Sequence, residues 1–113
     1  MAGAEVNDVL RFGDVMLDEA RHEVVRAGVA LELTPTEFAL LRFLLLNPKR
    51  VLSKYQILHN AWRHDFSGDV RVVDRYVSYL RRKLNQAGPE LIRTVRHRGY
   101  ALELPARGRS AAR

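Results

Sequence analysis

The sequence predicts an α+β domain in which four short antiparallel strands come first, three helices follow and a β-hairpin closes the chain. Three observations support this prediction. Short apolar runs broken by turn residues fill positions 9–33, apolar residues recur at helical spacing within positions 35–86, and two further short runs flank a basic turn near the end. With 113 residues, 47% of them hydrophobic, the chain has the size of one domain. We expect the domain to occupy residues 9–105, with disordered ends at 1–8 and 106–113.

Turn residues divide the first part of the chain into four strands. The runs VLRF, VMLD, EVVR and VALEL are separated by GD, by EARH and by AG. Alternation is clearest in the last run, where Val29, Leu31 and Leu33 share one face. Because connections this short join antiparallel neighbours, we expect one four-stranded antiparallel sheet.

Capping residues mark the starts of two helices. In LTPTEFALLRFLLLNP, Thr34 can cap the helix, Pro35 suits the first helical position and Glu37 completes a capping box, while the final Asn-Pro pair ends the helix. In LSKYQILHNAW, Ser53 and Gln56 repeat this pattern at the start of a second, shorter helix. The first helix is apolar on nearly every side, so we expect other elements to cover it.

A third helix is predicted over residues 70–86, with Asp69 placed to cap it and Gly88 and Pro89 placed to stop it. At about 100° per residue, its apolar and basic residues separate onto opposite faces. The buried face holds Val73, Val77, Leu80 and Leu84, and the opposite face, here called the basic ridge, holds Arg71, Arg75, Ser78 and Arg82. Asp74 is the only acid in this helix, whereas an ordinary solvated helix mixes charges of both signs.

The end of the domain is predicted to be a β-hairpin formed by LIRTV and YALEL around the turn RHRG. Arg96 and Arg98 lie at this tip, and Gly99 is expected to be its most flexible point. A basic tip without acids suits insertion into a minor groove or contact with phosphates. An exposed turn with incidental arginines is the alternative.

The net charge of +6 is unevenly distributed along the chain. Residues 1–33 carry seven acidic residues and three arginines, whereas residues 34–113 carry sixteen basic and six acidic residues. A basic surface within so small a domain indicates a polyanionic partner, most commonly nucleic acid, although it can also serve solubility alone.

The basic third helix fits the major groove of DNA, which is about 12 Å wide and bordered by phosphates. Residues near its N-terminus are best placed for base edges and those near its C-terminus for the DNA backbone. The first group is Arg71, Val72 and Arg75, and the second is Arg81, Arg82 and Lys83. Trp62, at the end of the second helix, can be a core residue, a donor from its indole N–H to a phosphate, or both.

Composition and spacing argue against several other classes of protein. The chain has no cysteine, and its longest apolar run, FALLRFLLL, is interrupted by Arg42 and is far shorter than the roughly 20 residues that span a bilayer. Its start does not have the pattern of a signal peptide, so we expect a soluble cytoplasmic protein. His59, His64 and Asp65 have no metal-site pattern, and no nucleophile pairs with a histidine. We therefore expect no metal, no cofactor and no catalysis.

Four segments, in this order, resemble the winged-helix DNA-binding domain of OmpR/PhoB-type response regulators. They are LTPTEFALLRFLLLNPKRVLSKYQIL, AWRHDF, VVDRYVSYLRRKL and IRTVRHRGYAL, and the resemblance extends from Val9 to Pro105. It implies a transcription regulator whose third helix reads the major groove and whose hairpin, the wing (residues 94–100), contacts the minor groove or phosphates. The residues that it implies to contact DNA are Trp62, Arg63, Arg71, Val72, Arg75, Tyr79, Arg82, Thr94, Arg96 and Arg98.

The resemblance also implies partners. Such domains bind promoter direct repeats as head-to-tail dimers, and the loop 63–69 corresponds to the segment used toward RNA polymerase or a neighbouring protomer. Family members usually carry a receiver domain on which a sensor histidine kinase acts. The 33 residues of strand-forming sequence at the start leave no room for one, so the chain is expected to be either an excised effector domain or a protein that stands alone.

Two features of the sequence keep alternatives open. Family members commonly have glycine after the arginine of the wing, whereas this chain has His97 there. This difference leaves the backbone geometry of the wing open. The loop RHDFSG and the exposed Tyr79 would also suit a winged-helix module that binds protein or RNA instead of DNA.

Overall fold

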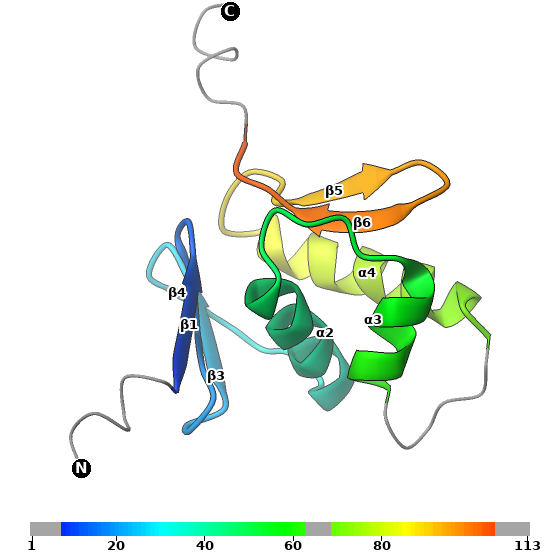
Figure 1. Cartoon of the computed structure of the whole chain (residues 1–113). Helices are drawn as coiled ribbons and strands as arrows, with labels where there is room; N and C mark the ends of the chain where they lie inside the picture. Colours follow the sequence, from blue (N-terminus) through cyan, green and yellow to red (C-terminus); the bar gives the residue numbers. More distant parts are fainter. Residues whose placement is uncertain (1–7, 63–68, 106–113) are drawn as a thin grey trace, which may run out of the picture.

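The computed structural model describes residues 8–62 and 69–105. A four-stranded antiparallel sheet in the order β1-β2-β3-β4 stands beside three helices and a two-stranded hairpin (Figure 1). Its strands are β1 (Val9–Phe12), β2 (Val15–Asp18), β3 (Glu23–Arg26) and β4 (Val29–Leu31). The four predicted strands are confirmed, and β4 ends two residues before the end of its predicted run. The ends expected to be disordered lie outside the described residues, apart from Asp8.

Helices α2 (Pro35–Leu46) and α3 (Lys54–Ala61) begin at the predicted capping boxes. The Thr34 hydroxyl accepts a hydrogen bond from the Glu37 backbone N–H at 3.2 Å, and the Glu37 carboxylate accepts one from the Thr34 N–H at 3.0 Å. Ser53 and Gln56 form the same pair of bonds at 3.1 and 2.8 Å. Each box satisfies two backbone donors at a helix start, which fixes where both helices begin.

Helix α4 (Arg71–Leu84) is shorter at both ends than the predicted range 70–86. Val70 holds the N-cap position, and its apolar side chain makes no capping bond. Asp69 satisfies one backbone donor instead, because its carboxylate accepts from the Arg71 N–H at 3.0 Å. The predicted role of Asp69 at the helix start is thus met from one residue further out.

Helix α2 lies at the centre of the core and packs against β1, α3 and α4. Its Leu40, Leu41 and Leu44 are fully buried. Around them pack inward-facing residues of the sheet and of α4: Phe12, Leu17, Val24, Val73, Val77, Leu80 and Leu84. The four α4 residues are each at most 1% exposed, so the predicted buried face of that helix and the central position of α2 are confirmed.

The C-terminal hairpin consists of β5 (Ile92–Val95) and β6 (Gly99–Leu102) and extends over α4 (Figure 1). The segment between α2 and α3 pairs with it, since Leu52 and Tyr100 exchange backbone hydrogen bonds of 2.8 and 3.0 Å. This bridge anchors the base of the hairpin to the helical part of the domain.

Gly99 is buried at the start of β6, so the expectation that it is the most flexible point of the hairpin is wrong. Its φ is +139°, and a Cβ atom at this position would lie 1.9 Å from the Leu52 carbonyl oxygen. Glycine is needed here because two backbones meet, and the close approach is internal to the protein.

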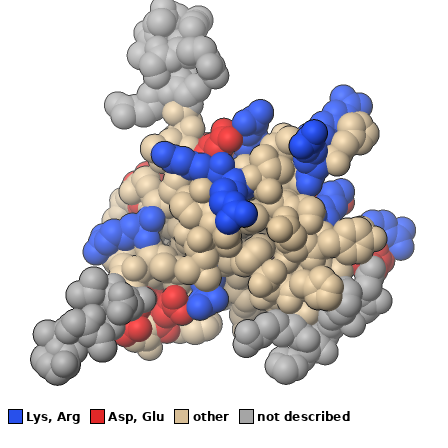
Figure 2. Space-filling view, viewed as in Figure 1, with Lys and Arg blue, Asp and Glu red and all other residues tan. Residues whose placement is uncertain are grey.

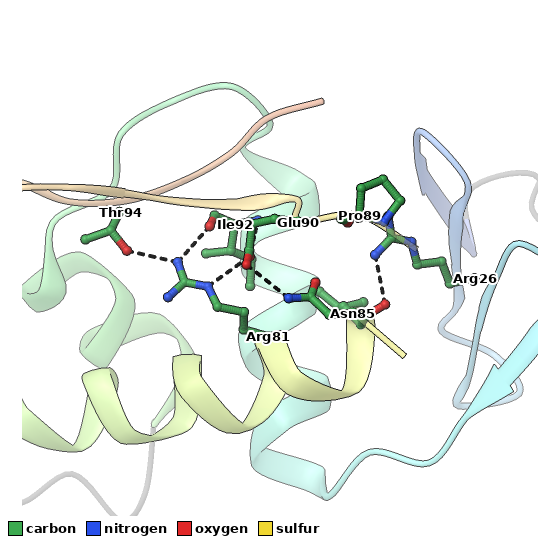
Figure 3. Close-up of polar contacts among 8 residues, drawn as sticks. Arg26, Arg81, Asn85, Pro89, Glu90, Ile92 and Thr94 are labelled. Carbon is green, nitrogen blue, oxygen red and sulfur yellow. Dashed lines mark hydrogen bonds and ion pairs between the residues drawn. The ribbon is translucent and has the colours of Figure 1, made fainter. Parts of the chain in front are cut away.

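Arg26 of β3 is 1% exposed and links the sheet to the end of α4 (Figure 3). Its Nη1 donates to the Leu84 carbonyl at 2.8 Å, its Nη2 to the Pro89 carbonyl at 2.6 Å, and its Nε to the Asp14 carboxylate at 2.9 Å. A buried arginine needs such partners for its charge and its donors. It also places a cation at the negative C-terminal end of α4.

None of the helices in residues 8–62 and 69–105 combines the length and the apolar character needed to cross a membrane.

Candidate nucleic-acid interface

The basic ridge of α4 faces solvent. Arg71, Arg75, Ser78 and Arg82 are all exposed, on the side of the helix away from its buried valines and leucines. The separation of faces predicted from helical geometry is therefore confirmed. Val72, also expected to contact DNA, is half-buried and packs against the edge of the core.

Arg71 forms a fork with Asp69 at the start of α4. Its Nε and Nη2 each lie 3.0 Å from a different oxygen of the Asp69 carboxylate, and the Arg71 side chain is 85% exposed. The hydrogen bonds from Arg71 lower the pKa of Asp69, and the same bonds raise the pKa of Arg71. An ion pair this exposed is worth little, so a phosphate or a base edge can replace Asp69 as the partner.

Arg75 and Arg82 differ from Arg71, because neither side chain makes a hydrogen bond or ion pair with any residue in the described part of the chain. They lie seven positions apart, two helical turns, on the same side of α4. Their donors are available to an external acceptor without loss of an internal contact.

Arg81 extends from α4 towards Glu90 and Thr94 at the C-terminal hairpin (Figure 3). Its Nε donates to the Glu90 carboxylate at 2.9 Å, while its Nη2 donates to the Ile92 carbonyl at 2.7 Å and to the Thr94 hydroxyl at 2.9 Å. Asn85 donates to the other Glu90 oxygen at 3.0 Å. Arg81 therefore joins α4 to β5, which is a different position from the phosphate-facing one expected for it, and it engages the Thr94 hydroxyl as well.

Lys83 is likewise tied inside the domain. Its ammonium group lies 2.7 Å from the carboxylate of Glu37, which is 3% exposed, and 2.9 Å from the Glu32 carbonyl. A buried carboxylate without such a partner would be strongly unfavourable. The expectation that Lys83 faces the DNA backbone is not met, since its charge neutralises Glu37.

Asp74, the single acid of α4, is also occupied. Its carboxylate accepts from the Lys54 ammonium group at 3.0 Å and from the Tyr100 hydroxyl, so it connects α3, α4 and β6. Burial and the hydrogen bond to Asp74 raise the pKa of Tyr100 to about 12. Asp74 therefore adds no unpaired negative charge beside the ridge.

The turn of the wing, residues 96–98, exposes all three of its side chains. A hydrogen bond of 2.9 Å from the Arg98 N–H to the Val95 carbonyl closes it, and His97 takes a φ of +66°. The side chains of Arg96 and Arg98 have no hydrogen bond or ion pair among the described residues. Figure 2 shows Lys and Arg side chains protruding at the upper right, where the turn between β5 and β6 lies in Figure 1. The departure from glycine is accommodated because histidine tolerates the left-handed region better than most residues.

Trp62 is 8% exposed and follows α3 as its C-cap residue. Its ring meets that of Tyr76 edge to face, with centroids 5.4 Å apart. These contacts support the core interpretation of Trp62. Arg63 and residues 63–68 of the predicted RNA polymerase loop lie outside the described residues, as do His64 and Asp65.

No group of three potential metal ligands occurs within residues 8–62 and 69–105.

Sequence reasoning missed the role of Arg26, although a signal for it exists. In the strand EVVR, Arg26 lies two residues after the buried Val24 and so shares its inward face. By contrast, no local sequence pattern predicts the bond of Arg81 to Glu90 or the bond of Lys83 to Glu37.

The chain matches a known family and many known proteins. The family described as "Transcriptional regulatory protein, C terminal" matches residues 28–102. Over 98 residues the chain is 53% identical to the probable transcriptional regulatory protein TcrX of Mycobacterium tuberculosis, covering 87% of this chain and 42% of TcrX. Over 99 residues it is 46% identical to the phosphate regulon transcriptional regulatory protein PhoB of Rhizobium meliloti, covering 87% and 44%. The DNA-binding domain of Klebsiella pneumoniae RstA, solved in complex with the RstA box, is similar with a TM-score of 0.73 and 29% identity, covering 84% and 96%.

The sheet, the three helices and the hairpin define a winged helix-turn-helix domain. The chain belongs to the OmpR/PhoB-type transcription regulators, as their C-terminal DNA-binding effector domain. This is a family of regulatory DNA-binding domains and not of enzymes. The chain spans less than half of the length of the curated relatives that it matches.

Proposed function

We propose that this domain binds double-stranded DNA with sequence preference, with α4 in the major groove and the wing in the minor groove or on phosphates. One observation carries the proposal. Within residues 8–62 and 69–105, the arginine and lysine side chains without an internal polar partner are Arg11, Lys49, Arg75, Arg82, Arg96 and Arg98. The last four belong to α4 and the wing turn, so the available positive charge gathers on the two elements that would meet DNA.

The proposed contacts divide by kind. Base edges are assigned to the exposed N-terminal and central part of α4, and phosphates to its remaining free arginine and to the wing. Base contacts come from Arg71, Val72, Arg75, Ser78 and Tyr79, and backbone or minor-groove contacts from Arg82, Thr94, Arg96 and Arg98. Arg81 acts through its bonds to β5 and the wing instead of through phosphate, and Trp62 acts by supporting α4.

For the longer protein, we propose the regulation that response regulators use. This domain binds promoter direct repeats as a head-to-tail dimer, and a sensor histidine kinase acts on a receiver domain elsewhere in the protein. The loop 63–69 contacts RNA polymerase or the neighbouring protomer. The folded domain extends over residues 9–105. The names of the relatives as transcriptional regulatory proteins support this proposal.

The test is selection of bound sites from a random duplex pool, followed by salt titration of binding to the selected site. We expect affinity to fall steeply with salt and Arg75→Ala to relax base preference, whereas Arg82→Ala should lower the slope of log K against log salt by about one. Arg42→Ala is the matched control, because Arg42 is an exposed arginine of α2 that pairs with Glu19. Equal affinity for selected and scrambled duplexes, or preference for RNA or a protein, would overturn the proposal.

A further inference from the structure

We propose that Tyr79 reads one thymine in the major groove, through contact between its ring and the thymine C5 methyl group, and that Tyr76 holds the ring in place. The inference rests on the proposed function and assigns a base chemistry to one position of it.

Tyr79 occupies the right place on α4. It follows Arg75 by four positions and precedes Arg82 by three, so it lies between the two free arginines of the helix. Tyr79 is 38% exposed, although a large aromatic residue of a small domain is usually placed where it can be buried. DNA that contacts Arg75 and Arg82 would therefore cover Tyr79.

The Tyr79 ring is held by a series of aromatic contacts that begins in the core. The Trp62 and Tyr76 rings meet at 5.4 Å with an interplanar angle of 73°, and the Tyr76 and Tyr79 rings at 5.3 Å with an angle of 75°. Both geometries are the favourable edge-to-face arrangement. Because Trp62 is buried, this series restrains Tyr79 before DNA binds, which reduces the entropy lost on binding.

The chemistry of the base edges then selects the partner. In the major groove, thymine alone presents a methyl group, whereas the other bases present hydrogen-bond donors and acceptors. The ring of Tyr79 offers apolar surface, and the adjacent arginines already supply donors suited to guanine or phosphate. A ring between two arginine forks is thus complementary to a thymine flanked by polar contacts.

The experiment replaces each thymine of the selected site with deoxyuridine, which removes only the methyl group. For the unchanged protein, we expect one position at which this replacement weakens binding about fourfold, the effect of one buried methyl group. Tyr79→Phe keeps the ring and should keep this sensitivity. Tyr79→Ala should bind the thymine site more weakly and bind the thymine and deoxyuridine sites equally. Tyr55→Ala, which removes an exposed tyrosine of α3, is the control and should retain the sensitivity.

The role of Tyr76 has its own readout. Tyr76→Leu keeps apolar volume but removes the ring that contacts Tyr79, so we expect a cooperatively folded protein in which the deoxyuridine effect is reduced. Full sensitivity in this variant would overturn the positioning role of Tyr76.

Three results would overturn the reading of thymine by Tyr79. They are a selected site without a deoxyuridine-sensitive thymine, unchanged sensitivity in Tyr79→Ala, and loss of sensitivity in Tyr79→Phe, which would assign the contact to the hydroxyl. Absence of any sequence preference in the unchanged protein is a different outcome, since it would overturn the proposed function itself.

Discussion

Two pairs of cations on α4 have opposite roles, although they lie within nine residues of one another. Arg81 and Lys83 are bound to Glu90 and Glu37 and join α4 to β5 and α2, whereas Arg75 and Arg82 have no polar partner among the described residues. Arg81 and Arg82 are even adjacent in the sequence. A single step of about 100° around the helix decides whether an arginine supports the fold or remains available for a ligand.

The comparison shows why counting positive charge overestimates a DNA-binding surface. A bound cation has to give up hydrogen bonds to carboxylates and carbonyls before it can meet a phosphate, and the group it leaves would then lack a partner. A free cation loses only its hydration and its side-chain freedom. The number of phosphate contacts is therefore set by the free group, while the bound group sets the stability and geometry of the domain.

The largest effect is expected at Arg26, the most deeply buried of the bound cations. Arg26→Ala removes the hydrogen bond to the Pro89 carbonyl and one of the two hydrogen bonds to the Leu84 carbonyl, which keeps the Ala87 N–H at 3.1 Å. It also creates a cavity, so we expect a loss of about 3 kcal/mol in the free energy of unfolding. Urea unfolding followed by circular dichroism measures it. A loss below about 1 kcal/mol would mean that the sheet is not coupled to the end of α4.

Substitution of the adjacent arginines should separate the two roles. Arg81→Ala is expected to lower the free energy of unfolding by about 1–2 kcal/mol and to leave the salt slope of DNA binding unchanged. Arg82→Ala should change stability by less than about 0.5 kcal/mol and reduce the salt slope by about one. Calorimetry and salt titration on both variants measure these effects. A reduced salt slope in Arg81→Ala together with a loss of stability in Arg82→Ala would contradict the assignment.

Alkaline pH should disrupt a bound cluster before it affects the free arginines. The folded-state pKa of Tyr100 is about 12, above the usual value of about 10, so ionisation favours the unfolded chain. The contribution of Tyr100 is fully present below pH 10 and is lost as pH rises from 10 through 12. Tyr100→Phe should be about 1 kcal/mol less stable at pH 8, without the hydrogen bond to Asp74, and should lose less stability at higher pH.

Urea unfolding at pH 8, 10 and 11 checks this expectation, with Tyr55→Phe at an exposed tyrosine as the control. Parallel losses for the unchanged protein and for Tyr100→Phe would show that Tyr100 does not carry the pH dependence.

The smallest effect is expected at the wing turn, where neither group of α4 cations is touched. Glycine adopts the left-handed conformation of His97 without strain but loses more entropy on folding, so His97→Gly should change the free energy of unfolding by only about 0.5 kcal/mol. His97→Val should cost about 1 kcal/mol, because a β-branched residue disfavours positive φ. Thermal unfolding distinguishes them, and equal stability of the two variants would contradict the turn geometry.

Most of the fold could be predicted because its signals are local. Two helix starts are predicted by capping boxes that each span four residues, Thr34 to Glu37 and Ser53 to Gln56. The strands are predicted by runs in which apolar and polar residues alternate. The exposed basic ridge could also be predicted, because the positions of its residues around α4 depend on helical geometry alone.

The partners of the cations could not be predicted, because they depend on tertiary position. Glu37 precedes Lys83 by 46 residues, and Arg26 precedes Leu84 by 58. The prediction for Gly99 was wrong for a related reason. The sequence indicates a flexible residue in a turn, whereas glycine is required there because the Leu52 backbone passes beside it. Contacts between residues that are far apart in the sequence leave no local pattern from which they could be predicted.

The bond from Arg26 to the end of α4 also has a consequence for engineering. The family match begins at residue 28, so a fragment trimmed to residues 28–102 would keep all of α4 and the wing but lack Arg26 and the first three strands. Such a graft would carry the whole proposed recognition surface on a helix that has lost the hydrogen bond from Arg26 to its last carbonyl. A chimaeric regulator that borrows this domain should therefore be joined ahead of β1, far in sequence from the residues it is meant to transplant.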